Sequence, residues 1–511
     1  MQKSKRYILT IDAGTTSVRT LLFDTKSNHL INIHGSRISQ SYPYTGWVDQ
    51  DANEIWDKVY NDLLSTIRGV EEEQIFGLGI TNQRETIVLW NKETGEPIAP
   101  AICWQDCRTE EYCMCLESNP ETRKLIYNKT GLIPNSYFSA SSLKWLLENC
   151  YEAKTLIAQN NLCCGTIDCY LVYRLTEGRN FVTDASNASR TMLYNINTND
   201  WDDDLLKMFG VPRSILPTVV DSNQIIGETI LAGKKIGIGG ILGDQQASLF
   251  GQACFDVGNI KNTYGTGSFM LLNVGQKPKF CENTRLLSTI AWRINGKTTY
   301  AIEGSILNAG SCVTWMEESL GLIKNPPQSE ELAVSVEDSN GVYFVPALCG
   351  LGAPYWDSCS RGMLAGMSLD TTKAHIVRSV LEGICYNIRA VFEKMIEDTG
   401  VNISSVRVDG GMTKNSFVMQ TQADTLQTEV MLSKETECTS IGAAFMSGLA
   451  FGAFKDFDDL RNRYKIGEVF KPKITKEDAD FYYEEWQETV TRAIKRPTDK
   501  FHTGMEYKKK K

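Results

Sequence analysis

The chain has 511 residues with a formal net charge of −9, and 42% of its residues are hydrophobic. A single hydrophobic core stops growing at about 250–300 residues, so this length predicts two large domains, which we place at residues 1–255 and 256–511. The acidic balance argues against nucleic acid as a partner, because phosphate backbones are held by clustered Lys and Arg. The lysines at 508–511 are interpreted as a solvated tail.

The sequence gives no signal for a membrane or a secretory compartment. No run of about 18 apolar residues occurs, and the apolar stretch after the basic residues 3–6 ends at Asp12, too early for a signal peptide. The 15 cysteines lack zinc-ligand spacing, and only 4 His are available to assist them. We therefore expect a cytoplasmic protein with reduced thiols that contacts no membrane.

The first half of the chain opens with strands and a helix. Two short apolar runs flank a glycine-containing turn at residues 7–24, which predicts a β-hairpin with a polar tip. Apolar residues at three- and four-residue steps predict a helix at Asn53–Ile67. Residues 236–250 and 259–273 repeat the pattern of strands with glycine-rich, polar ends.

The second half contains the clearest helical pattern. Apolar residues recur with helical spacing from about His375 to Thr399, and Gly400 stands where a C-terminal cap belongs. Strands mixed with amphipathic helices indicate an α/β architecture.

The turn at residues 14–17, Gly-Thr-Thr-Ser, has the composition of an anion site. Its backbone N–H groups and hydroxyls are donors, glycine lets an anion approach closely, and Arg19 adds a positive charge. Asp12, at the end of the preceding strand, is placed to face a hydrated Mg²⁺. By itself the turn is equally consistent with a simple local preference for Gly and Thr.

Two further glycine turns occur in the second half. Gly265 and Gly267 bracket Thr266, and one such turn in each half suits a nucleotide held between two domains. At residues 409–411, Asp-Gly-Gly joins an expected strand to an expected helix, although for this motif alone a simple tight turn is the favoured explanation. No Walker A sequence occurs, so a P-loop fold is not predicted.

Together these motifs resemble a known family. The motifs, in chain order, are Asp12-Ala-Gly-Thr-Thr-Ser17, Gly243-Asp-Gln-Gln246, Tyr264-Gly-Thr-Gly267, Asp409-Gly-Gly411 and Thr439-Ser-Ile-Gly-Ala-Ala444. This set resembles the FGGY carbohydrate kinase family, which belongs to the actin, Hsp70 and hexokinase superfamily of ATPases. The resemblance covers nearly the whole chain. It implies two ribonuclease H-like, actin-like ATPase domains that flank a deep cleft, with ATP and Mg²⁺ as cofactors.

Within that family, four segments are similar to members that phosphorylate glycerol. These segments are Gly79–Thr86, Asn187–Leu193, Gly243–Ala247 and Gly350–Asp357. The resemblance therefore implies ATP-dependent phosphorylation of glycerol to sn-glycerol 3-phosphate, a step of glycerol metabolism. It also implies a homodimer.

The resemblance further implies roles for individual residues. Residues expected to hold the hydroxyls of glycerol are Arg84, Glu85, Tyr137, Asp244 and Gln245, with Trp104 and Phe269 against its carbon atoms. Residues expected around the nucleotide are Gly14, Thr15, Thr16, Ser17, Gly265, Thr266, Gly267, Gly310, Thr314, Gly411 and Asn415. Thr314 stands where relatives often carry Gln, which leaves the detail of its nucleotide contact open.

The chemistry of these residue types suits the implied reaction. A primary alcohol must lose its proton as it attacks phosphorus, and Asp244 is the expected general base. Asp12 and Asp244 are the expected ligands of Mg²⁺, acting through water, while Arg19 stabilises charge on the phosphates. All three are therefore expected to act in catalysis.

Two alternatives remain open at this point. A kinase of the same family that acts on another polyol or sugar, such as a pentulose or gluconate, has similar nucleotide loops. A structural or chaperone ATPase related to actin or Hsp70 has them too, but needs no polar substrate pocket. The adjacent pairs Arg84-Glu85 and Asp244-Gln245, together with Tyr137, favour a small triol.

Overall fold

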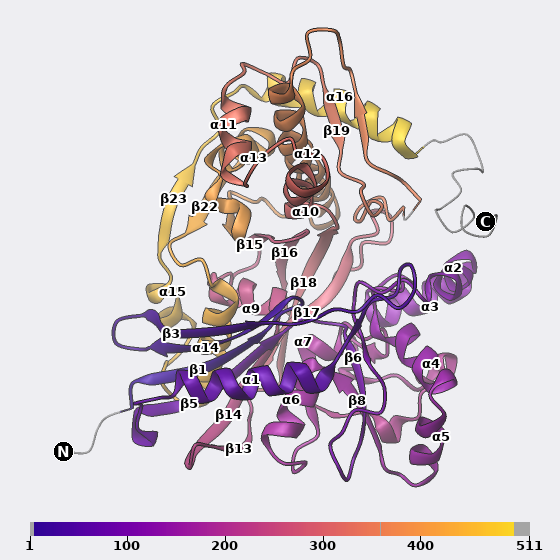
Figure 1. Cartoon of the computed structure of the whole chain (residues 1–511), viewed down its shortest axis with the longest axis vertical. Coiled ribbons are helices and arrows are strands. Elements are labelled where there is room, and N and C mark those ends of the chain that lie inside the picture. The colour runs from indigo at the N-terminus through magenta and orange to yellow at the C-terminus, as the bar shows by residue number, and fades with distance from the viewer. Residues whose placement is uncertain (1–4, 358, 495–511) are drawn as a thin grey trace.

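The protein is described by a computed structural model that covers residues 5–357 and 359–494. The lysine tail expected at 508–511 lies outside the described residues. Two large β-sheets organise the chain, and we call the parts built on them the N-lobe and the C-lobe. In Figure 1 the N-lobe, in indigo to magenta, lies below most of the C-lobe, which runs from pink through orange to yellow.

The N-lobe is built on a six-stranded sheet whose central strands are parallel. Its strands, in spatial order, are β13 (Ile225–Leu231), β14 (Lys234–Gly243), β5 (Ile75–Asn82), β1 (Tyr7–Ala13), β2 (Ser17–Asp24) and β3 (His29–Arg37). β14, β5 and β1 are almost entirely buried, as expected for parallel strands covered on both faces. The predicted hairpin at 7–24 is confirmed as the antiparallel pair β1 and β2.

The C-lobe is built on a seven-stranded sheet. Its strands, in spatial order, are β17 (Leu287–Ile294), β18 (Lys297–Ile306), β16 (Ser268–Gly275), β15 (Ile260–Tyr264), β21 (Ser405–Asp409), β22 (Glu429–Ser433) and β23 (Ile466–Phe470). The strand pattern predicted at 259–273 is confirmed as β15 and β16, which pair antiparallel around a polar tip.

Smaller sheets extend the lobes. A four-stranded sheet in the N-lobe contains β4 (Asp49–Gln50), β7 (Ala101–Ile102), β6 (Ile87–Asn91) and β8 (Leu162–Thr166). The two-stranded pairs are β9 (Val182–Asp184) with β12 (Thr218–Val220), β10 (Tyr194–Asn195) with β11 (Asp200–Trp201), and β19 (Tyr343–Val345) with β20 (Met363–Ala365).

Helices cover the faces of both large sheets (Figure 1). Those in the first half are α1 (Ala52–Thr66), α2 (Glu110–Ser118), α3 (Pro120–Thr130), α4 (Ser139–Asn149), α5 (Tyr151–Ala158), α6 (Ile167–Leu175), α7 (Ala185–Ala188), α8 (Asp203–Phe209) and α9 (Asp244–Gly251). Those in the second half are α10 (Gly310–Thr314), α11 (Pro327–Val334), α12 (Lys373–Thr399), α13 (Ser416–Leu426), α14 (Cys438–Ala450), α15 (Phe457–Arg463) and α16 (Lys476–Ile494). Within the described residues, no helix is both long enough and apolar enough to cross a membrane.

The two helices predicted in detail are confirmed. The pattern at Asn53–Ile67 corresponds to α1, whose N-cap Asp51 accepts a hydrogen bond from the backbone N–H of Asn53. The pattern at His375–Thr399 corresponds to α12, and Gly400 ends it in the left-handed conformation with a φ of 63°.

The lobes meet where α9 crosses α14. These helices approach so closely that a Cβ on Gly442 would lie 1.9 Å from the carbonyl oxygen of Ala247. A Cβ on Gly251 would lie 2.1 Å from the carbonyl oxygen of Cys438. Because α14 also packs on β1, β5 and β14, an element of the second half of the chain closes the back of the N-lobe sheet. The chain itself passes from one large sheet to the other between the end of α9 and the start of β15.

Candidate active site

The expected site residues of the N-lobe come together because the central strands end side by side. Ala13 at the end of β1 is paired with Asn82 at the end of β5, and Asn82 is paired with Gly243 at the end of β14. The 14–17 turn, Arg84 and Asp244 follow these three strand ends. Ligands of open α/β sheets bind at the carboxyl ends of the strands, and this edge faces the C-lobe.

The C-lobe presents a matching edge. Thr263 on β15 is paired with Asp409 on β21, and these two strands run parallel. The turns that begin at Gly265 and Gly410 therefore lie beside each other. The backbone N–H of Gly310, at the start of α10, donates to the carbonyl oxygen of Gly265 at 3.0 Å and brings a third segment to the same place.

Three adjoining cavities lie between these edges. The small pocket, of about 150 Å³, is lined by Thr15, Arg84, Glu85, Trp104, Tyr137, Asp244, Gln245, Thr263, Gly265, Thr266, Gly267 and Phe269. The central cleft, of about 450 Å³, includes Asp12, Gly14, Thr15, Thr16, Ser17, Arg19, Gly265, Thr266 and Gly411 in its walls. The large pocket, of about 660 Å³, includes Gly265, Thr266, Gly310, Thr314, Gly411 and Asn415. Every residue expected at the site therefore lines one of three cavities that share walls.

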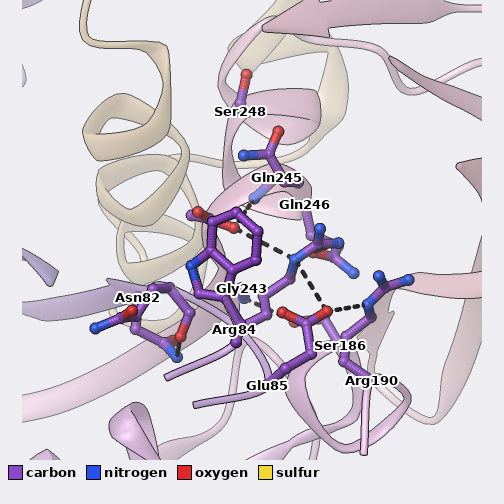
Figure 2. Close-up of polar contacts among 12 residues, drawn as sticks. Asn82, Arg84, Glu85, Ser186, Arg190, Gly243, Gln245, Gln246 and Ser248 are labelled. Carbon is purple, nitrogen blue, oxygen red and sulfur yellow. Dashed lines mark hydrogen bonds and ion pairs between the residues drawn. The ribbon is translucent and has the colours of Figure 1, made fainter. Parts of the chain in front are cut away.

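The small pocket is held by a buried cluster of charges. Arg84 and Glu85 are 2% and 3% exposed, so this adjacent pair is not a solvated surface couple. The guanidinium of Arg84 donates to both carboxylate oxygens of Glu303, at 2.5 and 3.0 Å. Arg190 donates to Glu85 at 2.6 Å and to Glu303 at 3.0 Å, and Figure 2 shows how Arg84, Glu85 and Arg190 converge. The cluster fixes Arg84 and Glu85 before any substrate binds.

Glu85 is also held in an unusual backbone conformation. Its φ is 63°, in the left-handed region that side chains other than glycine rarely adopt. The carbonyl oxygen of Glu85 accepts a hydrogen bond from the hydroxyl of Ser139 at 2.7 Å. Such strain persists where surrounding contacts determine it, and it is common at functional sites.

Asp244 begins α9 and faces the small pocket. Its carboxylate lies 3.4 Å from Nε of Arg84, and 27% of its side chain is exposed. Burial raises the pKa of Asp244, while the positive charges of Arg84 and Lys261 oppose that rise. A partly accessible carboxylate whose affinity for a proton is raised can accept one from a bound alcohol.

Aromatic rings form the other wall of the small pocket. Trp104 packs edge-to-face with Tyr137, at 5.5 Å between ring centroids, and with Phe269 at 6.2 Å. The indole N–H of Trp104 donates to the hydroxyl of Thr15 at 2.9 Å, so the aromatic wall is bonded to the 14–17 turn. One side of the pocket is therefore polar and charged, and the other is aromatic.

Tight turns supply many of the residues that line the central cleft. The N–H of Gly14 donates to the carbonyl of Ser17 at 3.0 Å, and the N–H of Gly265 donates to the carbonyl of Gly267 at 2.9 Å. Arg19 borders the cleft and pairs with Glu437 at 2.5 Å. Turns of this kind, beside an arginine, suit the phosphates of a nucleotide.

The large pocket continues from the cleft into the C-lobe. Gly411 is open to it, because a Cβ added there would meet no atom within 4 Å. Asn415 caps α13 by accepting a hydrogen bond from the N–H of Val418 at 3.0 Å. Thr314 is exposed, and its hydroxyl bonds only to the carbonyl of Gly310, at 3.4 Å. The size and mixed lining suit a nucleoside.

The carboxylates at the cleft fit a hydrated divalent cation. Burial raises the pKa of Asp12 to about 7; Arg19 opposes the rise, and the negative charge of Asp244 adds to it. The two carboxylates are therefore near enough to repel each other. Mg²⁺ needs only one or two carboxylates, with water and phosphate oxygens as the remaining ligands. Within residues 5–357 and 359–494 no cluster of three metal-binding side chains occurs.

The expected set omitted several buried residues that shape the site. Glu303 is fully buried on β18 and holds both arginines; its signal was a lone charge in the apolar run Tyr300–Ile306. Lys261 is fully buried on β15 and bonds to Gln245. Asp409, noted only as part of a glycine turn, accepts hydrogen bonds from Ser248 and Thr263 beside the cleft.

Two lobes with parallel strand ends facing a shared cleft, and a polar pocket next to an anion cradle, define a phosphoryl-transferring enzyme of the actin-like ATPase fold. The chain matches the FGGY family of carbohydrate kinases, with the N-terminal domain over residues 7–251 and the C-terminal domain over residues 260–451. The chain belongs to this family.

Comparison with individual relatives shows which members of this family the chain is similar to. A glycerol kinase of Francisella tularensis subsp. holarctica is 45% identical over 496 residues, covering 96% of this chain and 98% of the relative. A glycerol kinase of Saccharolobus islandicus is 46% identical over 492 residues, covering 96% and 97% of the two chains. The crystal structure of Plasmodium falciparum glycerol kinase with ADP is 35% identical and has a TM-score of 0.89, covering 97% of this chain and 99% of that one.

Proposed function

We propose that the protein transfers the γ-phosphoryl group of ATP to glycerol and forms sn-glycerol 3-phosphate and ADP. The observation that carries the proposal is the small pocket beside the central cleft. The charged side chains of Arg84 and Glu85 line one side of this pocket, and the aromatic rings of Trp104 and Phe269 line the other. Glycerol has three hydroxyls and a short apolar backbone, so it matches both walls. The similarity to glycerol kinases over almost the full chain supports the same assignment.

The placement of the pocket residues supports the role that we propose for each. Arg84, as a donor, and Glu85, as an acceptor, bind hydroxyls, as do Tyr137 and Gln245. Asp244 accepts the proton of the primary hydroxyl while its oxygen attacks the γ-phosphorus, and the bond from that phosphorus to the bridging oxygen of ADP breaks.

The nucleotide occupies the central cleft and the large pocket in this proposal. Its phosphates are held by the turns at residues 14–17 and 265–267, and its base lies near Asn415. Arg19 adds positive charge beside the phosphates. Mg²⁺, held near Asp12 and Asp244, would neutralise charge on the transferring phosphoryl group.

The pocket size supports a small polyol over a larger sugar. Its volume of about 150 Å³ is well below the roughly 300–1,000 Å³ common for drug-sized ligands. The charge cluster around Glu303 holds the polar wall in place, so widening it for a pentulose or gluconate requires moving buried ion pairs. A structural or chaperone ATPase needs no such pocket.

We further propose that the enzyme acts in the cytoplasm as a homodimer and binds neither nucleic acid nor membranes. The net charge of −9 supports the absence of nucleic-acid binding, and the family resemblance supports the dimer. Light scattering coupled to size-exclusion chromatography tests the dimer, for which we expect twice the chain mass.

One assay tests the function. The purified protein is incubated with Mg²⁺-ATP and glycerol, ³¹P NMR identifies the product, and coupled ADP detection compares glycerol with a panel of pentuloses, gluconate and other polyols. We expect a glycerol 3-phosphate resonance and the highest kcat/KM for glycerol. Preference for a pentulose or gluconate would assign a different substrate, and ATP hydrolysis with no phosphorylated product would contradict kinase function.

A further inference from the structure

Lys261 is a fully buried lysine close to the small pocket. It lies on β15, none of its surface is exposed, and it lines none of the three cavities. Burial lowers its pKa to about 8, although the negative charges around it oppose that effect. The charged or titratable groups that face it are Asp244, Asp409, Glu303, Arg84 and Cys254. A buried ammonium group is costly unless its donors are used, so its contacts are informative.

The first contact fixes the orientation of an amide in the small pocket. Nζ of Lys261 donates to Oε1 of Gln245 at 2.5 Å. A protonated lysine is only a donor, so the amide oxygen of Gln245 must face it. Gln245 lines the small pocket, so its NH₂ group is then left to face a substrate there as a donor.

The second contact leads to the central cleft. Nζ of Lys261 also donates to the hydroxyl of Thr263 at 2.8 Å. That hydroxyl donates to Oδ1 of Asp409 at 2.5 Å, and Ser248 donates to Oδ2 of Asp409 at 2.9 Å. Asp409 lines the central cleft, and Thr263 lines both the cleft and the small pocket. Lys261 thus joins the walls of two cavities that it does not itself touch.

We propose that Lys261 is a positioning residue that orients the amide of Gln245 for recognition of a substrate hydroxyl, while its bond to Thr263 anchors it to the wall of the phosphate-binding cleft. This inference rests on the proposed function, because it specifies how one polyol hydroxyl is selected. Without Lys261 the amide of Gln245 can turn over, and it then offers the pocket an oxygen as readily as an NH₂ group.

The test is a double-mutant cycle on substrate discrimination. Lys261→Met, Gln245→Ala and the double variant are assayed with Mg²⁺-ATP against glycerol and against propane-1,2-diol, which lacks one terminal hydroxyl. Lys297→Met, a change of an exposed lysine on β18 of the same sheet, is the matched control. Thermal midpoints and ADP binding, measured for every variant, report on folding.

We expect Lys261→Met to raise KM for glycerol about tenfold, the equivalent of one lost hydrogen bond, with a smaller change in kcat. The preference for glycerol over the diol should fall by a similar factor. The double variant should resemble Gln245→Ala, because Lys261 acts through that residue. Lys297→Met should match the wild type.

Other results overturn the inference. If the fold-changes caused by Lys261→Met and Gln245→Ala multiply in the double variant, Lys261 does not act through Gln245. If folded Lys261→Met keeps the wild-type preference for glycerol over the diol, Lys261 does not position Gln245 either. If Lys261→Met does not fold, Thr263→Val serves in its place, because it removes the second hydrogen bond of Lys261. Thr263→Val should lower the preference for glycerol over the diol, and it should have no such effect when Gln245→Ala is already present. An effect of Thr263→Val that is the same with and without Gln245→Ala would also overturn the inference. The assay of the wild type distinguishes failure of this inference from failure of the proposed function. A wild type that does not phosphorylate glycerol contradicts the proposed function itself.

Discussion

The two ends of the cleft are built by different means. At the small pocket, buried side chains from both lobes form the polar wall. They belong to one ion-pair cluster, which consists of Arg84, Glu85, Arg190 and Glu303. At the central cleft and the large pocket, turns and open glycines such as Gly411 supply much of the surface. The first end is fixed by charge, and the second is shaped by backbone.

In the proposed function, this difference separates the selection of the polyol from the binding of the nucleotide. Buried, paired charges are costly to rearrange, so we expect the small pocket to keep one geometry and to reject ligands that leave its polar groups unpaired. Backbone N–H groups hold phosphates whichever molecule carries them. Changes at the small pocket should therefore alter polyol selection and turnover, whereas changes at the large pocket should alter nucleotide affinity.

The largest expected effect is at Asp244. Replacing it with Asn keeps the shape but removes the group that accepts the proton of the alcohol, so kcat should fall about 10²–10⁴-fold. Binding of ADP, measured by calorimetry, should stay close to the wild-type value because the nucleotide end is untouched. A variant that keeps wild-type kcat would exclude Asp244 as the base.

Glu303 tests the rigidity of the small pocket. Glu303→Gln leaves two buried arginines with one anion fewer, and the free energy of unfolding should fall by about 3–5 kcal/mol. Urea denaturation measures the loss. Glu488→Gln is the matched control, since its exposed pair with Arg492 should contribute less than about 0.5 kcal/mol. Equal effects in the two variants would mean that the buried cluster does not hold the pocket.

The sequence predicted local features well and distant pairings poorly. The hairpin at 7–24 and the helix at His375–Thr399 follow from alternation, periodicity and a glycine cap, all of which are local. The partnership of Arg84 with Glu303 joins residues 219 positions apart, and only the folded chain reveals it. The pair Arg84-Glu85 has the appearance of a surface couple in sequence, so the family resemblance was needed to place it in a pocket.

Lys261 and Glu303 show why the omitted residues were hard to find. Lys261 stands in the short run Ile-Lys-Asn-Thr-Tyr, and Glu303 directly follows the apolar residues Tyr300–Ile302. Neither pattern names the residue that pairs with the charge. The glycine turns were easier, because the backbone conformation that they require restricts the residue type.

Asp168 is a buried carboxylate that accepts hydrogen bonds from hydroxyl groups, and it can be compared with Glu303, which is paired with two arginines. Burial raises the pKa of Asp168 to about 7, and hydroxyl donors from Thr166 and Thr183 offset this only in part. Burial would also raise the pKa of Glu303, but Arg190 and Arg84 lower it to about 2. Glu303 therefore stays ionised, and the stability from its pairing is lost only as the pH falls below about 4.5 toward 2.

Asp168 should show the opposite pH dependence. Its folded pKa lies above its unfolded value near 3.8, so its contribution to stability is present below pH 4 and is lost as the pH rises through 7. Asp168→Asn removes this loss, and its stability relative to the wild type should increase by about 2–3 kcal/mol between pH 5 and pH 8. Urea midpoints across that range measure the slope. A difference that does not change with pH would show that Asp168 is ionised in the fold throughout.

The smallest expected effect is at the nucleotide end. A Cβ at Gly411 projects into open space, so Gly411→Ala should fold normally, raise KM for ATP about fivefold and leave KM for glycerol unchanged. Gly310→Ala is the matched comparison, because its Cβ would lie 2.5 Å from the carbonyl oxygen of Gly265 and must displace that turn. It should lower both the thermal midpoint and kcat, as overpacking against backbone does. If Gly411→Ala instead raised KM for glycerol, the two ends of the cleft would not bind their ligands independently. The effect of the added Cβ would then reach the small pocket through the turn at Gly265, which lines both ends.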